Sequence, residues 1–179
     1  VSALLDMALI FHGPPDPDLS VQLHRVAEGH GRWAIVHWSA AIALFLMSGA
    51  GFLILFGGAA GQPVSGHPGA WMVFSLGALL TFSTAVSEAS VVSVAAATGD
   101  QSAFETWWAF SSGMANGFAA LGIATGLIAF AHLRAGTGRL RAWAAMAGIA
   151  AGFLSASGWV LGEWLGVSVG GPIWLISTL

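Results

Sequence analysis

Few side chains in this sequence can take part in chemistry, and one of them lies where ionisable groups are rare. Glu88 falls in the stretch TFSTAVSEASVVSVAAA, residues 81–97, which otherwise has the composition of a membrane-spanning helix. A carboxyl group inside the hydrocarbon layer costs free energy, so such residues usually bind a ligand, an ion or a proton. The structural interpretation, which we rank slightly ahead, is a neutral Glu88 that is hydrogen-bonded to a neighbouring helix.

When each predicted span is measured at about 1.5 Å per helical residue, Glu88 is expected about 14 Å below the outer face of the membrane, and three further polar residues about 9 Å below it. They are His37, Asp6 and Asn116. With Glu88 they form a predicted polar cluster in the outer half of the bilayer. This cluster is the candidate site for a proton, a cation or a small polar ligand, and its structural alternative is a set of interhelical hydrogen bonds.

Six histidines raise the question of a haem, chlorophyll or metal site. Bis-histidine haem needs two ligands at matching depth on facing helices, and His37 has no predicted partner of that kind. Ligation of a chlorophyll-type pigment or haem by His37 alone stays an alternative. His24, His30 and His37 are separated by glycines, so a shared helix face is not expected. We therefore predict no metal site, and bound lipids complete the expected non-protein components.

The composition excludes several functional classes. There is no Cys, and all five basic residues are Arg, which excludes disulfides, thiolate ligands, cysteine nucleophiles and Schiff-base lysines. A net charge of −3 without a basic patch argues against nucleic acid as a partner. The motifs HExxH and GxSxG and the phosphate-binding glycine signatures are missing. We therefore do not expect an enzyme.

Membrane-spanning helices are the elements that must position these residues. Hydrophobic residues make up 56% of the chain and charged residues only 7%, with a mean hydropathy of +0.81, whereas soluble domains are about 25% charged. Apolar runs longer than about 18 residues recur along the chain. We predict a single all-α transmembrane domain over 1–179 with about six spans, at 1–11, 33–57, 70–97, 108–132, 141–162 and from 165 to the end. The first and last of these are short or partial.

A short helix at the membrane surface is predicted in DPDLSVQLHRVAEGHGRW, which follows the first span. Asp16 is a candidate N-cap, Pro17 suits the first helical position, and the helix is expected to end near Gly29 or Gly31.

The arginines predict the orientation of the bundle. Arg134, Arg139 and Arg141 flank the loop between the fourth and fifth spans. By the positive-inside rule this loop, 133–140, lies in the cytoplasm. The segments 12–32 and 98–109 then lie outside.

Glycines spaced four residues apart occur in the fourth and fifth spans. Gly113 pairs with Gly117, and Gly148 pairs with Gly152. Small residues at this spacing let helix backbones approach closely. We expect both faces to pack tightly against a neighbouring helix.

The order of HGPPDPD, GHGRWAIVHW, a mid-span acid and LRAGTGRLRAW resembles a broad group of uncharacterised six-helix bacterial membrane proteins. Members typically show a His-Pro end to the first helix, Trp and His opening the second, and an acid inside the third. Here His12 is followed by Gly before the prolines. The resemblance implies the fold and its topology, in a bacterial cytoplasmic membrane, and it implies no activity.

Three functional hypotheses follow from these features. Compact size, short loops and Gly-rich helix faces favour a non-catalytic multi-pass subunit of a larger membrane assembly, such as an energy-converting or photosynthetic complex. Its partners would be the lipid bilayer and other membrane subunits. The first alternative is an ion-, proton- or ligand-handling membrane protein that uses the cluster around Glu88. The second is a pigment- or haem-binding subunit that uses His37.

Overall fold

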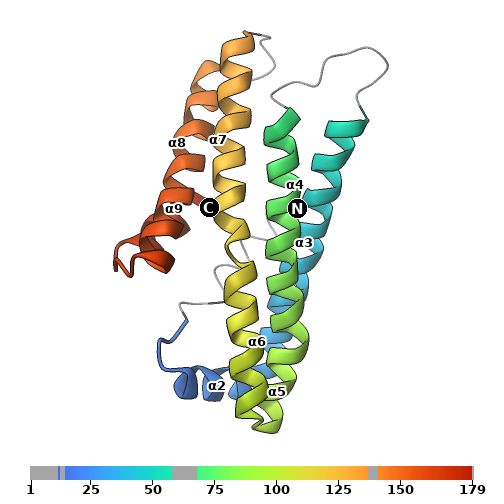
Figure 1. Ribbon diagram of the computed structural model, residues 1–179, viewed down its shortest axis with the longest axis vertical. Helices are drawn as coiled ribbons and strands as arrows, with labels where there is room; N and C mark the ends of the chain where they lie inside the picture. The colour runs from blue at the N-terminus through green and yellow to red at the C-terminus, as the bar shows by residue number, and fades with distance from the viewer. Residues whose placement is uncertain (1–11, 13–14, 58–67, 137–140, 179) are drawn as a thin grey trace. The chain divides into compact units, whose positions relative to one another are not determined.

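The computed structural model describes residues 12, 15–57, 68–136 and 141–178, and every regular element within these ranges is helical. The predicted all-α class is therefore confirmed. In chain order the helices are α2 (Leu19–Glu28), α3 (His30–Phe56), α4 (Pro68–Ser87), the π-helical turn η1 (Glu88–Val92), α5 (Ser93–Thr98), α6 (Gln101–Met114), α7 (Gly117–Ala135), α8 (Ala142–Trp159), a second π-helical turn η2 (Val160–Trp164) and α9 (Gly170–Thr178) (Figure 1).

Four continuous helical stretches are long and apolar enough to cross a membrane. They are His30–Phe56, Pro68–Thr98, Gln101–Ala135 and Ala142–Trp164, and they correspond to the second to fifth predicted spans. Their length and composition fit a membrane protein. The first predicted span, 1–11, lies outside the described residues, and α9 is too short by itself to cross a hydrocarbon layer of about 30 Å.

The fourth predicted span, 108–132, begins earlier than expected, because α6 begins at Gln101, and the outside location of 98–109 stays a prediction. Only Gly99 and Asp100 separate α5 from α6. Gly99 has φ 71°, a left-handed conformation that suits glycine at a helix end. The Asp100 carboxylate accepts a hydrogen bond from the Ala103 N–H and caps α6. The polar residues after this cap lie on a helix surface, which hydropathy alone does not distinguish from a loop.

The contacts divide the described chain into two compact units. One unit holds the residues up to Leu46 together with Leu80–Ala115, and the other holds Met47–Leu79 together with Asn116–Leu179. The long helices α3 and α4 contribute residues to both units. The single domain predicted over 1–179 stays a prediction.

In the first unit, the predicted surface helix is present as α2. Its N-cap is Asp18 rather than Asp16, because the Asp18 carboxylate accepts hydrogen bonds from the N–H groups of Ser20 and Val21. The hydrogen bond from the Ser20 hydroxyl, followed by those from the two amides, lowers the pKa of Asp18 below its usual value. The helix ends at Glu28 and has Gly29 as its C-cap, as expected.

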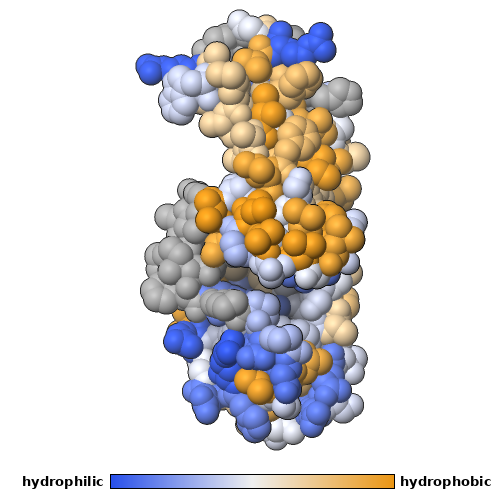
Figure 2. Space-filling view, turned by 90° about the vertical axis from the view of Figure 1, so that its left-hand side faces the viewer, coloured by the Kyte–Doolittle hydropathy of each residue, from blue (hydrophilic) through white to orange (hydrophobic). Residues whose placement is uncertain are grey.

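Helix α2 covers the hairpin formed by α5 and α6, lying across these two helices rather than along them (Figure 1). Leu23 and Val26 on its buried face belong to one hydrophobic cluster with Val92 and Phe104. Polar residues occupy its outer face, so hydrophilic colours gather over α2 on the side shown in Figure 2. This helix therefore has one apolar and one aqueous face, as expected at a membrane boundary.

In the second unit, glycines bring α7 and α8 into backbone contact. A Cβ added to Gly122 would lie 2.7 Å from the Gly152 carbonyl oxygen, and one added to Gly152 would lie 2.5 Å from the Gly126 nitrogen. The neighbour expected for the glycines of the fifth span is thus α7 of the same chain.

The other predicted packing glycines differ in their surroundings. A Cβ on Gly148 would lie 3.0 Å from that of Ala129, and the Gly117 carbonyl oxygen lies 3.0 Å from a Cβ placed on Gly77. Gly113 has no atom of another group within 4 Å of its Cβ position. For Gly113, the predicted packing against a neighbouring helix stays a prediction.

Candidate metal centre

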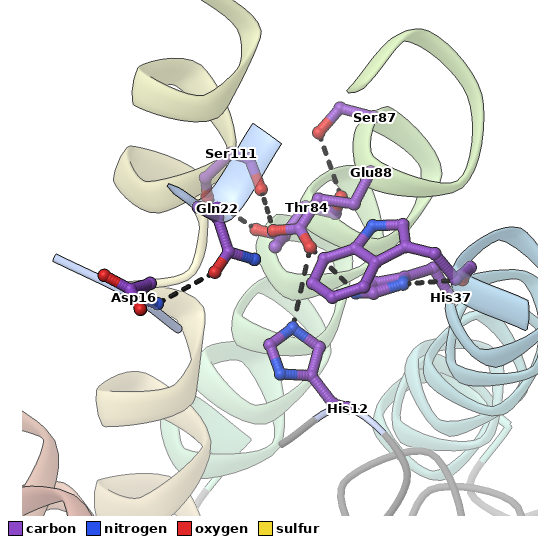
Figure 3. A network of polar contacts seen from close by, with 9 residues as sticks. His12, Asp16, Gln22, His37, Thr84, Ser87, Glu88 and Ser111 are labelled. Carbon is purple, nitrogen blue, oxygen red and sulfur yellow. Dashed lines mark hydrogen bonds and ion pairs between the residues drawn. The ribbon is translucent and has the colours of Figure 1, made fainter. Parts of the chain in front are cut away.

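Two imidazole rings and one carboxylate meet in the first unit (Figure 3). Glu88 Oε2 lies 2.7 Å from His37 Nε2 and 3.7 Å from His12 Nε2. One ligand atom from each of the three residues falls within 4.8 Å of the other two. His37 and Glu88 are buried, whereas the His12 side chain is 27% exposed. His12 is therefore the most exposed of the three groups.

Helix α3 positions His37 about two turns after its start, within a helix that is long and apolar enough to cross a membrane. The Nδ1 of His37 lies 2.8 Å from the carbonyl oxygen of Trp33, one turn earlier. The indole of Trp33 packs against both imidazoles, with ring centroids 4.7 Å from His12 and 4.5 Å from His37. This arrangement fixes the orientation of the His37 ring, so that Nε2 faces Glu88.

Glu88 is the first residue of the π-helical turn η1, between α4 and α5. Such turns insert an extra residue into a helix and are frequent at functional sites. The Ser111 hydroxyl of α6 donates a short hydrogen bond to Glu88 Oε1. The backbone carbonyl of Ser111 accepts the Thr84 hydroxyl at 2.9 Å. Oε1 is thus held by α6, which leaves Oε2 directed at the imidazoles.

The protonation of His37 follows from its partners. A carbonyl oxygen can only accept, so the Nδ1 that faces Trp33 carries a hydrogen, and in the neutral ring Nε2 is a lone pair. That lone pair then faces a carboxylate oxygen at 2.7 Å, an arrangement that needs either a proton or a metal ion between the two atoms. Among the described groups, Oε2 has no hydrogen bond beyond its contacts with the two imidazoles. A proton can bridge one such pair, whereas a metal ion can be shared by all three groups.

The structure brings together two of the four residues predicted for the polar cluster, His37 and Glu88. Asp6 lies outside the described residues. The sequence predicts a loop at His12 and gives no reason to single out Ser111, yet both residues touch Glu88. The sequence signals for His12 are its place at the end of an apolar stretch, directly before the Gly-Pro-Pro run, and its match to the His-Pro end of the first helix in the resemblance. Ser111 carries no signal, because serines are common in the spans.

The fourth predicted residue, Asn116, belongs to the other unit. It lies between α6 and α7, and its side-chain oxygen accepts hydrogen bonds from the indole nitrogens of Trp159 and Trp164 at 3.1 and 2.8 Å. These bonds tie the break between α6 and α7 to α8 and η2. Within its unit, Asn116 therefore has a structural role.

Comparison of the chain with protein-family models, with curated proteins and with solved structures gives no match. The function is therefore argued from the geometry of this site.

Proposed function

We propose that this is a multi-pass membrane protein that binds one divalent transition-metal ion between His12, His37 and Glu88. The observation that carries the proposal is the convergence of two imidazole nitrogens on one carboxylate oxygen inside a helical unit. This makes the ion-handling alternative more specific and ranks it above the accessory-subunit hypothesis, which no contact of the described residues favours.

The chemistry of the three groups suits such an ion. Neutral imidazole binds Zn²⁺, Fe²⁺, Ni²⁺ and Cu²⁺, and two His with one Glu or Asp is a recurrent ligand set for zinc and non-haem iron. The surrounding hydrogen bonds also fit. A metal-binding His commonly donates its other N–H to a backbone carbonyl, as His37 does to Trp33, and ligating carboxylates are themselves hydrogen-bonded, as Glu88 is by Ser111.

The same geometry makes the tetrapyrrole alternative less favourable. Both ring nitrogens of His37 face protein groups, Nδ1 toward Trp33 and Nε2 toward Glu88. A haem or chlorophyll would require Nε2 to face an open surface wide enough for a macrocycle. We therefore place the ion ahead of the pigment.

Six spans, a bacterial cytoplasmic membrane and an outward-facing site complete the proposal. Four long apolar helices support several crossings. Arg134 in the last turn of α7, together with Arg139 and Arg141 before α8, supports a cytoplasmic location for the connection between these helices.

Metal binding to the purified full chain tests the proposal. The protein, freed of any polyhistidine tag and of bound metal, is titrated in detergent with Zn²⁺ and with Co²⁺ by calorimetry. We expect one ion per chain. Glu88→Gln keeps the shape of the side chain and its acceptor for Ser111 but removes the charge. Zn²⁺ affinity should therefore fall by more than about 100-fold, which exceeds the usual loss when only a hydrogen bond to a metal ligand is removed.

The control is His24→Ala, which removes an exposed histidine of α2 that is not one of the three proposed ligands. Its Zn²⁺ affinity and stoichiometry should equal those of the unaltered chain. Failure of the unaltered chain to bind either ion would refute the metal proposal and leave a proton-bridged pair. Equal affinities for Glu88→Gln and His24→Ala would place the bound ion elsewhere.

A further inference from the structure

Gln22 of α2 has a buried polar side chain, and it is not one of the three proposed metal ligands. It is 1% exposed, although it lies on a helix whose outer face is polar. Its Oε1 accepts a hydrogen bond from the backbone N–H of Asp16 at 2.8 Å. Because that N–H can only donate, the amide cannot be turned around, and the –NH₂ group must point the other way.

The Nε2 of Gln22 is buried and has no hydrogen-bond partner among the residues that the structure describes. Figure 3 shows this nitrogen pointing toward Glu88, on the side away from Asp16. The indole nitrogen of Trp33, whose ring packs against both imidazoles, is likewise buried without a described partner. A buried donor without an acceptor is unfavourable, and such donors often mark a place where a ligand or water completes the network.

We propose that Gln22 positions an oxygen ligand on the metal, with its Nε2–H donating to a water molecule, a hydroxide or a small anion bound at an open coordination position. This inference rests on the metal proposal above. Three protein ligands leave a tetrahedral ion one position short, which is the arrangement of sites that bind an exogenous ligand. The candidate ligand and Gln22 are complementary, because an oxygen on the metal keeps a lone pair that accepts a hydrogen bond. Gln22 is thus a positioning residue, and the fourth ligand is an acceptor.

Azide binding to the Co²⁺-loaded full chain tests this role, since azide is an anion that takes an open metal position and changes the visible absorption of Co²⁺. The unaltered chain should show a saturable spectral change. Gln22→Glu keeps an oxygen for the Asp16 N–H but has no donor toward the metal, and Gln22→Met removes both functions. In both variants azide affinity should fall by about 10-fold or more, the effect of one hydrogen bond to a charged group, whereas Co²⁺ should still bind at one ion per chain.

Gln101→Met is the control, because Gln101 is an exposed glutamine of α6 that bonds only its neighbour Glu105 among the contacts described. Its azide affinity should match that of the unaltered chain.

Equal azide affinity in Gln22→Glu, Gln22→Met and Gln101→Met would overturn the role of Gln22. Co²⁺ binding without any response to azide would overturn the open position while the metal proposal stands. Absence of Co²⁺ binding would remove both. If Gln22→Met does not fold, Gln22→Glu decides alone.

Discussion

Ser111 illustrates how an uncharged residue can set the geometry of the charged site. Its hydroxyl holds Glu88 Oε1 and its carbonyl accepts the Thr84 hydroxyl, so the carboxylate is oriented by α4 and α6 together. We expect Ser111→Ala to weaken Zn²⁺ binding by about 10- to 100-fold, as loss of an outer-shell hydrogen bond usually does. Stoichiometry should remain one ion per chain, and Ser111→Thr should retain most of the affinity. Calorimetric titration beside Ser112→Ala, an exposed neighbour on α6, gives the comparison. A dissociation constant for Ser111→Ala equal to that of Ser112→Ala would contradict this role.

At the scale of elements, the π-helical turn η1 and the glycines of α7 and α8 affect helix packing in different ways. The π-helical turn η1 places Glu88 where the helical stretch Pro68–Thr98 departs from the α-helical register. The turn inserts an extra residue into the helix. Compared with a helix of strict 3.6-residue period, it therefore rotates the residues after Glu88 about the helix axis by roughly 100°. The glycines of α7 and α8 instead remove side chains, so that the two backbones touch.

Gly152→Leu should therefore destabilise the second unit. A Cβ at Gly152 already falls 2.5 Å from the Gly126 nitrogen and 2.6 Å from the Gly122 carbonyl oxygen, and backbone atoms cannot move aside as a side-chain end can. Overpacking costs typically about 1–3 kcal/mol, and we expect the upper end or more here. Intrinsic Trp fluorescence during heating in detergent measures the melting temperature. Gly113→Leu is the matched control, since nothing lies within 4 Å of its Cβ position. Equal melting temperatures for the two variants would show that α7 and α8 do not pack in this way.

At the scale of the whole molecule, the proposed orientation in the membrane determines from which side an ion would reach the proposed metal site. The proposed topology places the turn between α5 and α6 outside and the turn between α7 and α8 in the cytoplasm. The absence of Cys allows single cysteines to report on this directly. In intact cells an impermeant maleimide should label Ser102→Cys, and it should label Ala135→Cys only after the membrane is opened. Both positions are exposed. The opposite labelling pattern would turn the bundle around and make the site accessible from the cytoplasm.

The local properties of the sequence were sufficient to predict the all-α class and most of the long helices. Hydropathy and length determine whether a helix can cross a membrane, and both are sums over neighbouring residues. The α2 helix was likewise predictable from its cap and its glycine end, although the cap is Asp18 and not Asp16. The predicted start of the fourth span at 108 was too late, because polar residues on the surface of a helix resemble a loop when only hydropathy is considered.

The site itself was decided by tertiary structure. Glu88 and His37 were recognisable one by one, because each is an ionisable group in an apolar stretch. Glu88 also contacts His12 and Ser111, which are 76 and 23 positions away from it in the sequence. These contacts depend on how each helix is rotated and on the π-helical turn that begins at Glu88. Rotation about a helix axis changes by about 100° per residue, so an uncertainty of one residue turns a side chain away from its partner. The sequence determined that a carboxyl group lies in a long apolar helix, and only the packing of the helices determined which groups it contacts.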